Sequence, residues 1–439
     1  MRELPNWPAG DVTGFLQPYR VLDLSDERGL LAGHMLAQLG ADVIQVEPLA
    51  GSTARSVGPF SVDEPAGENS FLWSAWAAGK RSLALDLSSY AGQVLLQSLL
   101  KQADFLIESA DPEQRQAWGI TPERIRELHP ALIHVSISAF GIDGPKADYA
   151  ASDLTVWAAG GALLPSRDGD RPPLRMSVPQ TWQNAAGDAA AGALIAHFAR
   201  LHSGRGQHVD VSAQQSVTLC TLAVSLAAQY GHEQFVIPGS AGADRKARKE
   251  LDLSGSGSRT RRSKWAVRDG LVEMHLGIGP AGGRFSNSLF RWLASEGACD
   301  ADVAAWDWVT LPPRLLAQEI TEADMERARD SVANFLARFT KTELLEKAIE
   351  LRLLCAPVAT TQDLLDSPHL AARGYFQQVT EASGATRTLP GSFAIGVPHG
   401  FTTPKPAPAL GEHSAVVLSE WLGMDVPGIA TLRHEGTVQ

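Results

Sequence analysis

The amino-acid sequence predicts an α/β protein with a parallel sheet and more than one domain. Short apolar segments alternate with helical segments through the first 140 residues, and this alternation is typical of βαβ units. With 439 residues, the chain is too long for one ordinary hydrophobic core. Beyond Gln229 the alternation ends and the sequence changes character, which indicates a separate region of structure.

The parallel sheet is predicted from six short apolar segments in chain order, which are Arg20–Ser25, Asp42–Glu47, Ser82–Leu87, Asp104–Ser109, Leu132–Ser138 and His208–Ser212. The helices expected between them are Gly29–Leu39, Tyr90–Gln102, Pro122–Leu128 and Ala185–Leu201. Gly40 closes the first of these helices, and Gly204 with Gly206 stops the last.

The second region begins with a polar, Gly/Ser-rich and basic segment, Gly239–Lys264, which is typical of a loop or linker. A hairpin follows over Lys264–Leu276, with Asp269 and Gly270 expected as its turn. Helical segments continue to about Leu353.

Composition excludes several classes of protein. The net charge of −11 argues against a nucleic-acid-binding protein. No stretch approaches the ~20 uninterrupted apolar residues that span a bilayer, and the first residues, MRELPNWPAGD, do not resemble a secretory signal. Three widely separated cysteines without metal-ligand spacing favour a reducing cytoplasm. The histidine spacing predicts no metal site.

Five short motifs occur in a fixed order along nearly the whole chain: VLDLS…LGADVIQVEP, GKRSLALDL, GRGQHVDVS, CAPV and LGEH. Together they resemble the class III CoA-transferase family. The resemblance implies a Rossmann-like large domain formed by both chain ends, a smaller middle domain, and two chains that interlock. The boundaries expected on this basis are 1–215 for the large domain, 216–262 for a linker and basic loop, 263–350 for the small domain, and 351–439 for a segment that returns to the large domain.

The resemblance also implies a nucleophilic aspartate, placed twenty-two residues before the first glycine of the GRGQ motif. In this chain that position is Trp182, counted back from Gly204 without a gap. Only a carboxylate can form the acyl anhydride and then carry CoA as a thioester. The expected function is therefore a CoA-transferase subunit without its own nucleophile, which works beside an aspartate-bearing family member. SVPQTWQNAAGDAAAGAL is closest to the non-catalytic subunit of benzylsuccinate-type transferases.

Two alternatives remain open at this point. A shifted register would make Asp188 the nucleophile of a self-sufficient homodimeric enzyme, since Asp188–Gly192 imitates the Asp-x-x-x-Gly of the family. Otherwise the chain performs racemase-like acyl-CoA chemistry, or acts as a structural partner. The racemase relatives use a His–Asp pair, and here the His position holds Ser152 beside Asp153, which is expected to be a structural acid.

Candidates for binding CoA follow from the same resemblance: Ser25–Gly29, Arg55, Lys80, Arg81 and Leu85. Lys80 and Arg81 are expected to contact phosphate, and Leu85 the adenine ring. Other family positions for polar or basic groups hold Pro48, Ser88 and Ala117, which implies weak CoA binding. A basic segment is expected to be solvated, or to meet CoA phosphates or an acidic partner; its residues are Arg245, Lys246, Arg248, Lys249, Arg259, Arg261, Arg262 and Lys264.

The expected ligands are acyl-CoA and a carboxylic acid, and no cofactor is expected to be permanently bound. Succinyl-CoA as donor and an aromatic or steroid-like acid as acceptor fit the resemblance. Eleven tryptophans suit either a roomy aromatic site or an ordinary core.

Overall fold

The computed structural model describes residues 14–62, 69–164, 166, 172–222, 226, 229–230, 264–381, 384–395, 401–402 and 405–439. Contacts divide the chain into two compact units. The larger unit comprises Met1–Leu163, Arg175–Leu222 and Pro368–Gln439, and the smaller comprises Leu164–Leu174 and Ala223–Ser367. The four-part division implied by the family resemblance stays a prediction.

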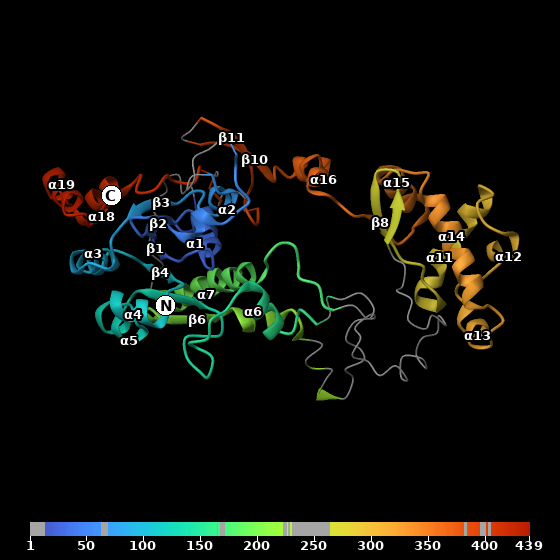
Figure 1. The fold of residues 1–439 in the computed structure, drawn as a ribbon, viewed down its shortest axis with the longest axis horizontal. Helices are drawn as coiled ribbons and strands as arrows, with labels where there is room; N and C mark the ends of the chain where they lie inside the picture. Colours follow the sequence, from blue (N-terminus) through green and yellow to red (C-terminus); the bar gives the residue numbers. More distant parts are fainter. Residues whose placement is uncertain are drawn as a thin grey trace. The chain divides into compact units, whose positions relative to one another are not determined.

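The larger unit is built on a six-stranded parallel sheet of order β3-β2-β1-β4-β5-β6 (Figure 1). Its strands are β1 (Arg20–Leu24), β2 (Asp42–Glu47), β3 (Arg81–Ala84), β4 (Phe105–Glu108), β5 (Ile133–Ser138) and β6 (His208–Ser212). All six lie where the sequence predicts them. β3 ends three residues early, and after it Leu85 forms only an isolated bridge with Val438.

Helices connect these strands or follow the last of them. They are η1 (Thr53–Ser56), α1 (Leu30–Gln38), α2 (Phe71–Trp76), α3 (Tyr90–Leu100), α4 (Pro112–Trp118), α5 (Pro122–Leu128), α6 (Asp153–Ala159), α7 (Thr181–Ser203) and α8 (Ala213–Leu219). Gly40 and Gly204 take the positive φ angles of 95° and 70° that follow α1 and α7, as the sequence predicts.

Two hydrophobic clusters cover the two faces of the sheet, because successive strand residues point to opposite sides. Val21, Val43 and Phe105 belong to one cluster, with buried residues of α1 and the alanines of α7. Leu22, Ile44 and Leu106 belong to the other, with α3, α5 and the C-terminal helices. Near-continuous burial of the central strands is typical of a parallel sheet with helices on both faces.

The C-terminal segment completes the larger unit. It contains α17 (Pro368–Ala372), a hairpin of β10 (Phe376–Thr380) and β11 (Thr386–Pro390), α18 (Ser414–Leu422) and α19 (Val426–His434). Figure 1 shows α18 near β3 and α3, and α18 contacts both of them. Trp421 of α18 lies in the same cluster as Leu85 and Val438.

The smaller unit combines a three-stranded antiparallel sheet with helices. The strands are β7 (Lys264–Val267), β8 (Gly270–Met274) and β9 (Cys355–Pro357), and the helices are α11 (Gly279–Ser295), α12 (Ala301–Ala304), α13 (Leu311–Leu316), α14 (Glu322–Leu336), α15 (Lys341–Leu351) and α16 (Thr361–Leu365). The predicted hairpin is present, but its turn lies one residue early: Val267 pairs with Gly270, so Arg268 and Asp269 form the turn.

Many tryptophans pack in hydrophobic cores. Trp265, Trp292, Trp306 and Trp308 lie in the core of the smaller unit, where Phe290 stacks on Trp308 with ring centroids 4.6 Å apart. Trp73 and Trp421 are buried in the larger unit. The observed positions of these six indicate ordinary core packing, not an aromatic site.

The basic residues from Arg245 to Arg262 lie outside the described residues, so their expected contacts stay a prediction. Within the described ranges, no helix is both long enough and apolar enough to cross a membrane.

Candidate functional site

The strand order points to one edge of the sheet. The order β3-β2-β1-β4-β5-β6 reverses direction between β1 and β4. In open α/β sheets, ligands bind beyond the carboxyl ends of the strands at such a reversal. The segments that follow β1 and β4 are Ser25–Gly29 and Ser109–Asp111. The first of these is among the predicted CoA contacts.

Direct contacts join these two segments. The Asp26 backbone N–H donates to Ser109 Oγ at 3.0 Å, and the Ser109 hydroxyl donates to Asp26 Oδ1 at 2.9 Å. Arg28 pairs with Asp26 at 2.7 Å and also donates to the Ser109 carbonyl. Gly29 is required here, because a Cβ at this position would lie 2.6 Å from the Cβ of Ser25. The ion pair is about one-third exposed, so it faces solvent at this edge.

Helix α7 begins at the same edge. Its far end lies at the amino ends of the strands, because Gly206 and Gln207, just beyond it, bond to Pro130 and His134 next to the start of β5. At its near end, Asp153 Oδ1 accepts from the Thr181 backbone N–H at 2.9 Å, and the Thr181 hydroxyl donates to the Asp153 carbonyl at 2.9 Å. Asp153 therefore fixes the start of α7, which confirms it as a structural acid.

Trp182 lies in the first turn of α7, half-buried against the hydrophobic cluster that contains α1 and β5. α7 runs without interruption from Thr181 to Ser203, and Gly204 ends it in the left-handed conformation. The count from Trp182 to the glycine of the GRGQ motif thus runs along one continuous helix.

Asp188 lies elsewhere on this helix. Six residues after Trp182, it is about 9 Å farther along the helix axis and about 120° around it. Its side chain is exposed, and within the described part of the chain no hydrogen bond or ion pair involves it. The structure therefore does not place Asp188 where Trp182 lies.

Arg55 lies beside β2 as predicted, and its contacts are internal. It pairs with Glu47 through two hydrogen bonds of 2.7 and 2.9 Å. Its guanidinium also donates to the Pro408 carbonyl at 3.1 Å and lies 3.8 Å from the ring centroid of Trp73.

Lys80 is buried completely. Its ammonium donates to Asp23 Oδ2 at 2.7 Å, to the Leu30 carbonyl at 2.8 Å and to Gln45 Oε1 at 2.9 Å. These three acceptors use all three N–H groups of the ammonium. Burial lowers the pKa of Lys80, and the attraction of Asp23 opposes that shift.

The other two predicted CoA contacts also have structural partners. Arg81 forks onto Asp42 and pairs with Glu420 at 2.6 Å, with its side chain partly exposed. Leu85 is fully buried in a hydrophobic cluster. As CoA contacts, Arg55, Lys80, Arg81 and Leu85 stay predictions, and the observed contacts favour structural roles for all four.

Ordered polar groups line this edge of the sheet, but no carboxylate described there is free to act as the nucleophile. Asp26 and Asp153 each accept hydrogen bonds from the protein itself. Ser109 is not among the predicted site residues, because only the strand order places it beside Asp26. In the described ranges, no three His, Cys, Asp or Glu side chains are arranged to hold a metal ion.

Comparison with known proteins identifies the family to which the chain belongs. Residues 16–256 and 291–414 match CoA-transferase family III. The chain is 31% identical over 410 residues to the BbsE subunit of succinyl-CoA:(R)-benzylsuccinate CoA-transferase from Thauera aromatica, with 92% of this chain and 93% of the relative covered. It is 28% identical to succinate–glutarate CoA-transferase from Agrobacterium fabrum, over 92% of this chain and 95% of that protein.

Solved structures agree on the fold. A CAIB/BAIF family protein from Brucella suis has a TM-score of 0.73 at 22% identity, with 92% of this chain and 98% of that one covered. At this identity the likeness concerns the α/β fold alone.

Proposed function

Because the chain belongs to CoA-transferase family III, we propose that it is one subunit of an enzyme that moves CoA between carboxylic acids, and that its partner supplies the nucleophile. One observation supports this proposal: Trp182 lies in the first turn of an uninterrupted α7, at the position where the family resemblance expects an aspartate.

The chemistry of transfer makes this position decisive. A carboxylate attacks the acyl-CoA thioester, an acyl anhydride forms, and the CoA thiolate leaves. The thiolate then attacks the enzyme carboxyl carbon, so the acid departs and CoA stays on the enzyme as a thioester. An indole has no oxygen nucleophile and cannot enter this sequence.

The alternatives receive less support. Asp188 is exposed and lies about two turns beyond the start of α7, so using it would require a different local structure. A racemase needs two opposed acid/base groups. At the His position, Ser152 instead caps α6 by accepting from the Thr155 backbone N–H at 3.3 Å.

The contacts of the cations predicted to bind CoA also support a partner subunit that carries the active site. Phosphate binding needs cations with free donors, whereas Arg55 and Lys80 are committed to buried carboxylates. In the proposed assembly, the live CoA site belongs mainly to the aspartate-bearing subunit. Two chains would interlock, with both chain ends in the large domain; the return of Pro368–Gln439 to the larger unit supports this layout.

The substrate class comes from the relatives. Three of them bear names with succinyl-CoA or succinate: the benzylsuccinate, glutarate and D-citramalate CoA-transferases. We propose succinyl-CoA as donor and, because the benzylsuccinate relative is named a subunit, an aromatic acid as acceptor for a hetero-oligomer.

The test compares the purified chain with the chain co-expressed beside an aspartate-bearing family member. We expect the lone chain to give no CoA transfer from succinyl-CoA to benzylsuccinate or benzoate, by chromatography of the CoA esters, and the pair to be active. Asp188→Ala in this chain should leave the activity of the pair unchanged.

Turnover by the lone chain that disappears with Asp188→Ala would contradict the proposal and favour the shifted register. Trp182→Asp offers a positive test, because it restores a carboxylate at the start of α7. A trapped acyl or CoA adduct on residue 182 of this variant, detected by mass spectrometry, is expected if the surrounding site is intact.

A further inference from the structure

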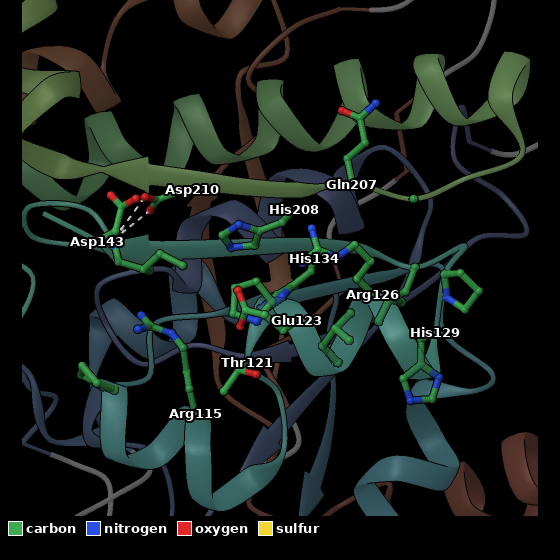
Figure 2. Close-up of a pocket in the computed structure, with 17 residues that line it drawn as sticks. Arg115, Thr121, Glu123, Arg126, His129, His134, Asp143, Gln207, His208 and Asp210 are labelled. Carbon is green, nitrogen blue, oxygen red and sulfur yellow. Dashed lines mark hydrogen bonds between the residues drawn. The ribbon is translucent and has the colours of Figure 1, made fainter.

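A cavity of about 500 Å³ lies beside β5 and β6 in the larger unit (Figure 2). α7 covers one face of these strands. On the opposite face, His134, His208 and Asp210 line the cavity, and residues of α4 and α5 form its other wall. A cavity of this size suits a small molecule. None of the predicted site residues lines it.

Arg115 supplies a buried cation to this cavity. Its Nε donates to Glu108 Oε1 at 2.9 Å, and the whole residue is only 5% exposed. Within the described part of the chain, no hydrogen bond is recorded from either Nη nitrogen of Arg115. Figure 2 shows the side chain reaching from α4 toward His208 and Asp143. The outer edge of the guanidinium therefore remains available for a carboxylate, which binds such an edge through two parallel hydrogen bonds.

His134 adds a second unused polar atom. It is 1% exposed, and its Nδ1 has no hydrogen-bond partner in the described residues. Its Nε2 lies 3.5 Å from Glu108 Oε1. A buried polar atom without a partner costs free energy.

The neighbouring His208 is not a cation at neutral pH. Burial and the proximity of His134 lower the pKa of His208 to about 4. Its Nε2 lies 2.9 Å from Ser136 Oγ. Positive charge in the inner part of the cavity is thus concentrated on Arg115.

The rim and walls restrict the ligand further. Glu123, Asp143 and Asp210 are exposed at the rim beside one exposed cation, Arg126, so acids outnumber cations there and oppose a ligand of high negative charge such as CoA. The walls include the apolar side chains of Ile125, Leu132 and Ile142. We propose that this cavity binds a small organic monocarboxylate, with its carboxylate on Arg115 and its apolar body against these walls.

The proposal is tested with benzoate as probe on the full-length chain, by saturation-transfer NMR and calorimetry. We expect a Kd of about 1 mM or tighter for benzoate, with weaker binding by at least about tenfold for neutral benzamide and for doubly charged phthalate. These two compounds keep the ring and change only the charge.

Variants then locate the binding. Arg115→Lys keeps a cation beside buried Glu108 but removes the planar fork, and we expect benzoate affinity to fall by about tenfold or more. Ile142→Trp fills the cavity from its edge without touching the Arg115–Glu108 pair, and should also weaken binding. Arg124→Gln is the matched control, because Arg124 lies on α5, outside the cavity, and pairs with Glu127.

Unchanged benzoate binding in both cavity variants, equal binding of benzamide, or no benzoate binding by the wild-type chain at about ten times the expected Kd would each overturn the proposal. Unfolding midpoints of the variants guard against a misfolded sample. These experiments measure benzoate binding alone, so their outcome for the cavity does not depend on whether the chain takes part in CoA transfer.

Discussion

At the scale of single residues, two adjacent cations show how burial changes the role of a charge. Lys80 and Arg81 follow each other in the motif that predicts phosphate binding. Lys80 is fully buried against Asp23, and Arg81 lies at the surface between Asp42 and Glu420. Removing one partner of a buried pair leaves an uncompensated charge, whereas surface pairs contribute little.

We therefore expect Lys80→Met to lower the free energy of unfolding by about 3–5 kcal/mol. Arg81→Met, the matched surface change, should cost about 0–1 kcal/mol. Urea unfolding followed by circular dichroism measures both values.

The double variant Lys80→Met with Asp23→Asn is the control, since it removes both charges. It should be more stable than Lys80→Met alone. Equal, small effects of Lys80→Met and Arg81→Met would show that Lys80 is not held in the buried pair, and would return it to the list of free phosphate ligands.

At the scale of elements, small residues let helices approach the sheet closely. In α7, the buried face consists of alanines, including Ala185, Ala189 and Ala193, which contact the cluster shared with α1. In α1, Gly33 lies directly over Asp23, where an added Cβ would come within 2.0 Å of the Oδ2 atom. Gly187 of α7 differs, because a Cβ there would meet nothing within 4 Å.

These two helical glycines should respond oppositely to alanine. Gly187→Ala should stabilise the protein by about 1 kcal/mol, because alanine favours the helix and meets no obstacle. Gly33→Ala should destabilise it by roughly 1–3 kcal/mol, because the new methyl group presses on the Asp23–Lys80 pair. Thermal unfolding of both variants checks this, and a loss of stability in Gly187→Ala would contradict the open space described beside it.

Elements were predictable wherever a local pattern determines them. A few neighbouring residues are enough to predict a buried apolar strand or a helix that ends at glycine. All six parallel strands and α7 therefore lie close to their expected positions. α4 is not among the predicted elements, although Asp111 and Gln114 form a capping box and Pro112 occupies the first helical position. Arg115 on that helix was consequently missed as a cavity residue.

The site was less predictable than the fold because its partners are distant in sequence. Asp23 and Lys80 are separated by 57 residues, and Ser109 and Asp26 by 83. The sequence of a motif is the same whether its lysine or arginine binds a phosphate or pairs with a buried carboxylate. Only the three-dimensional pairing distinguishes these roles.

At the scale of the whole molecule, histidines with lowered pKa values make stability depend on pH. Burial, assisted by nearby Lys80, lowers the pKa of His34 to about 4, against the opposing effect of the Ala78 carbonyl. His208 is lowered to about 4 by burial and by His134. Both imidazoles are neutral in the folded protein, while the unfolded chain takes up protons near pH 6.5.

The folded state should thus have its full stability above about pH 6.5 and lose it progressively as pH falls toward 4. His34 accounts for at most about 3 kcal/mol of this loss. Free energies of unfolding at half-unit pH intervals measure the slope. His208→Gln should flatten the curve in this window, and stability that rises between pH 6.5 and 5 would contradict the assignment.

The return of residues 414–439 to the first strands has a consequence for synthesis on the ribosome. Asp86 N–H bonds to the Thr437 carbonyl at 2.9 Å, and Trp421 packs in the cluster that contains Leu22 and Leu83. The flank of β3 consequently stays uncovered while some 330 further residues emerge from the exit tunnel. The smaller unit is translated in full before the larger one can close, and a nascent chain at this stage would be a natural client for chaperones that shield apolar surface.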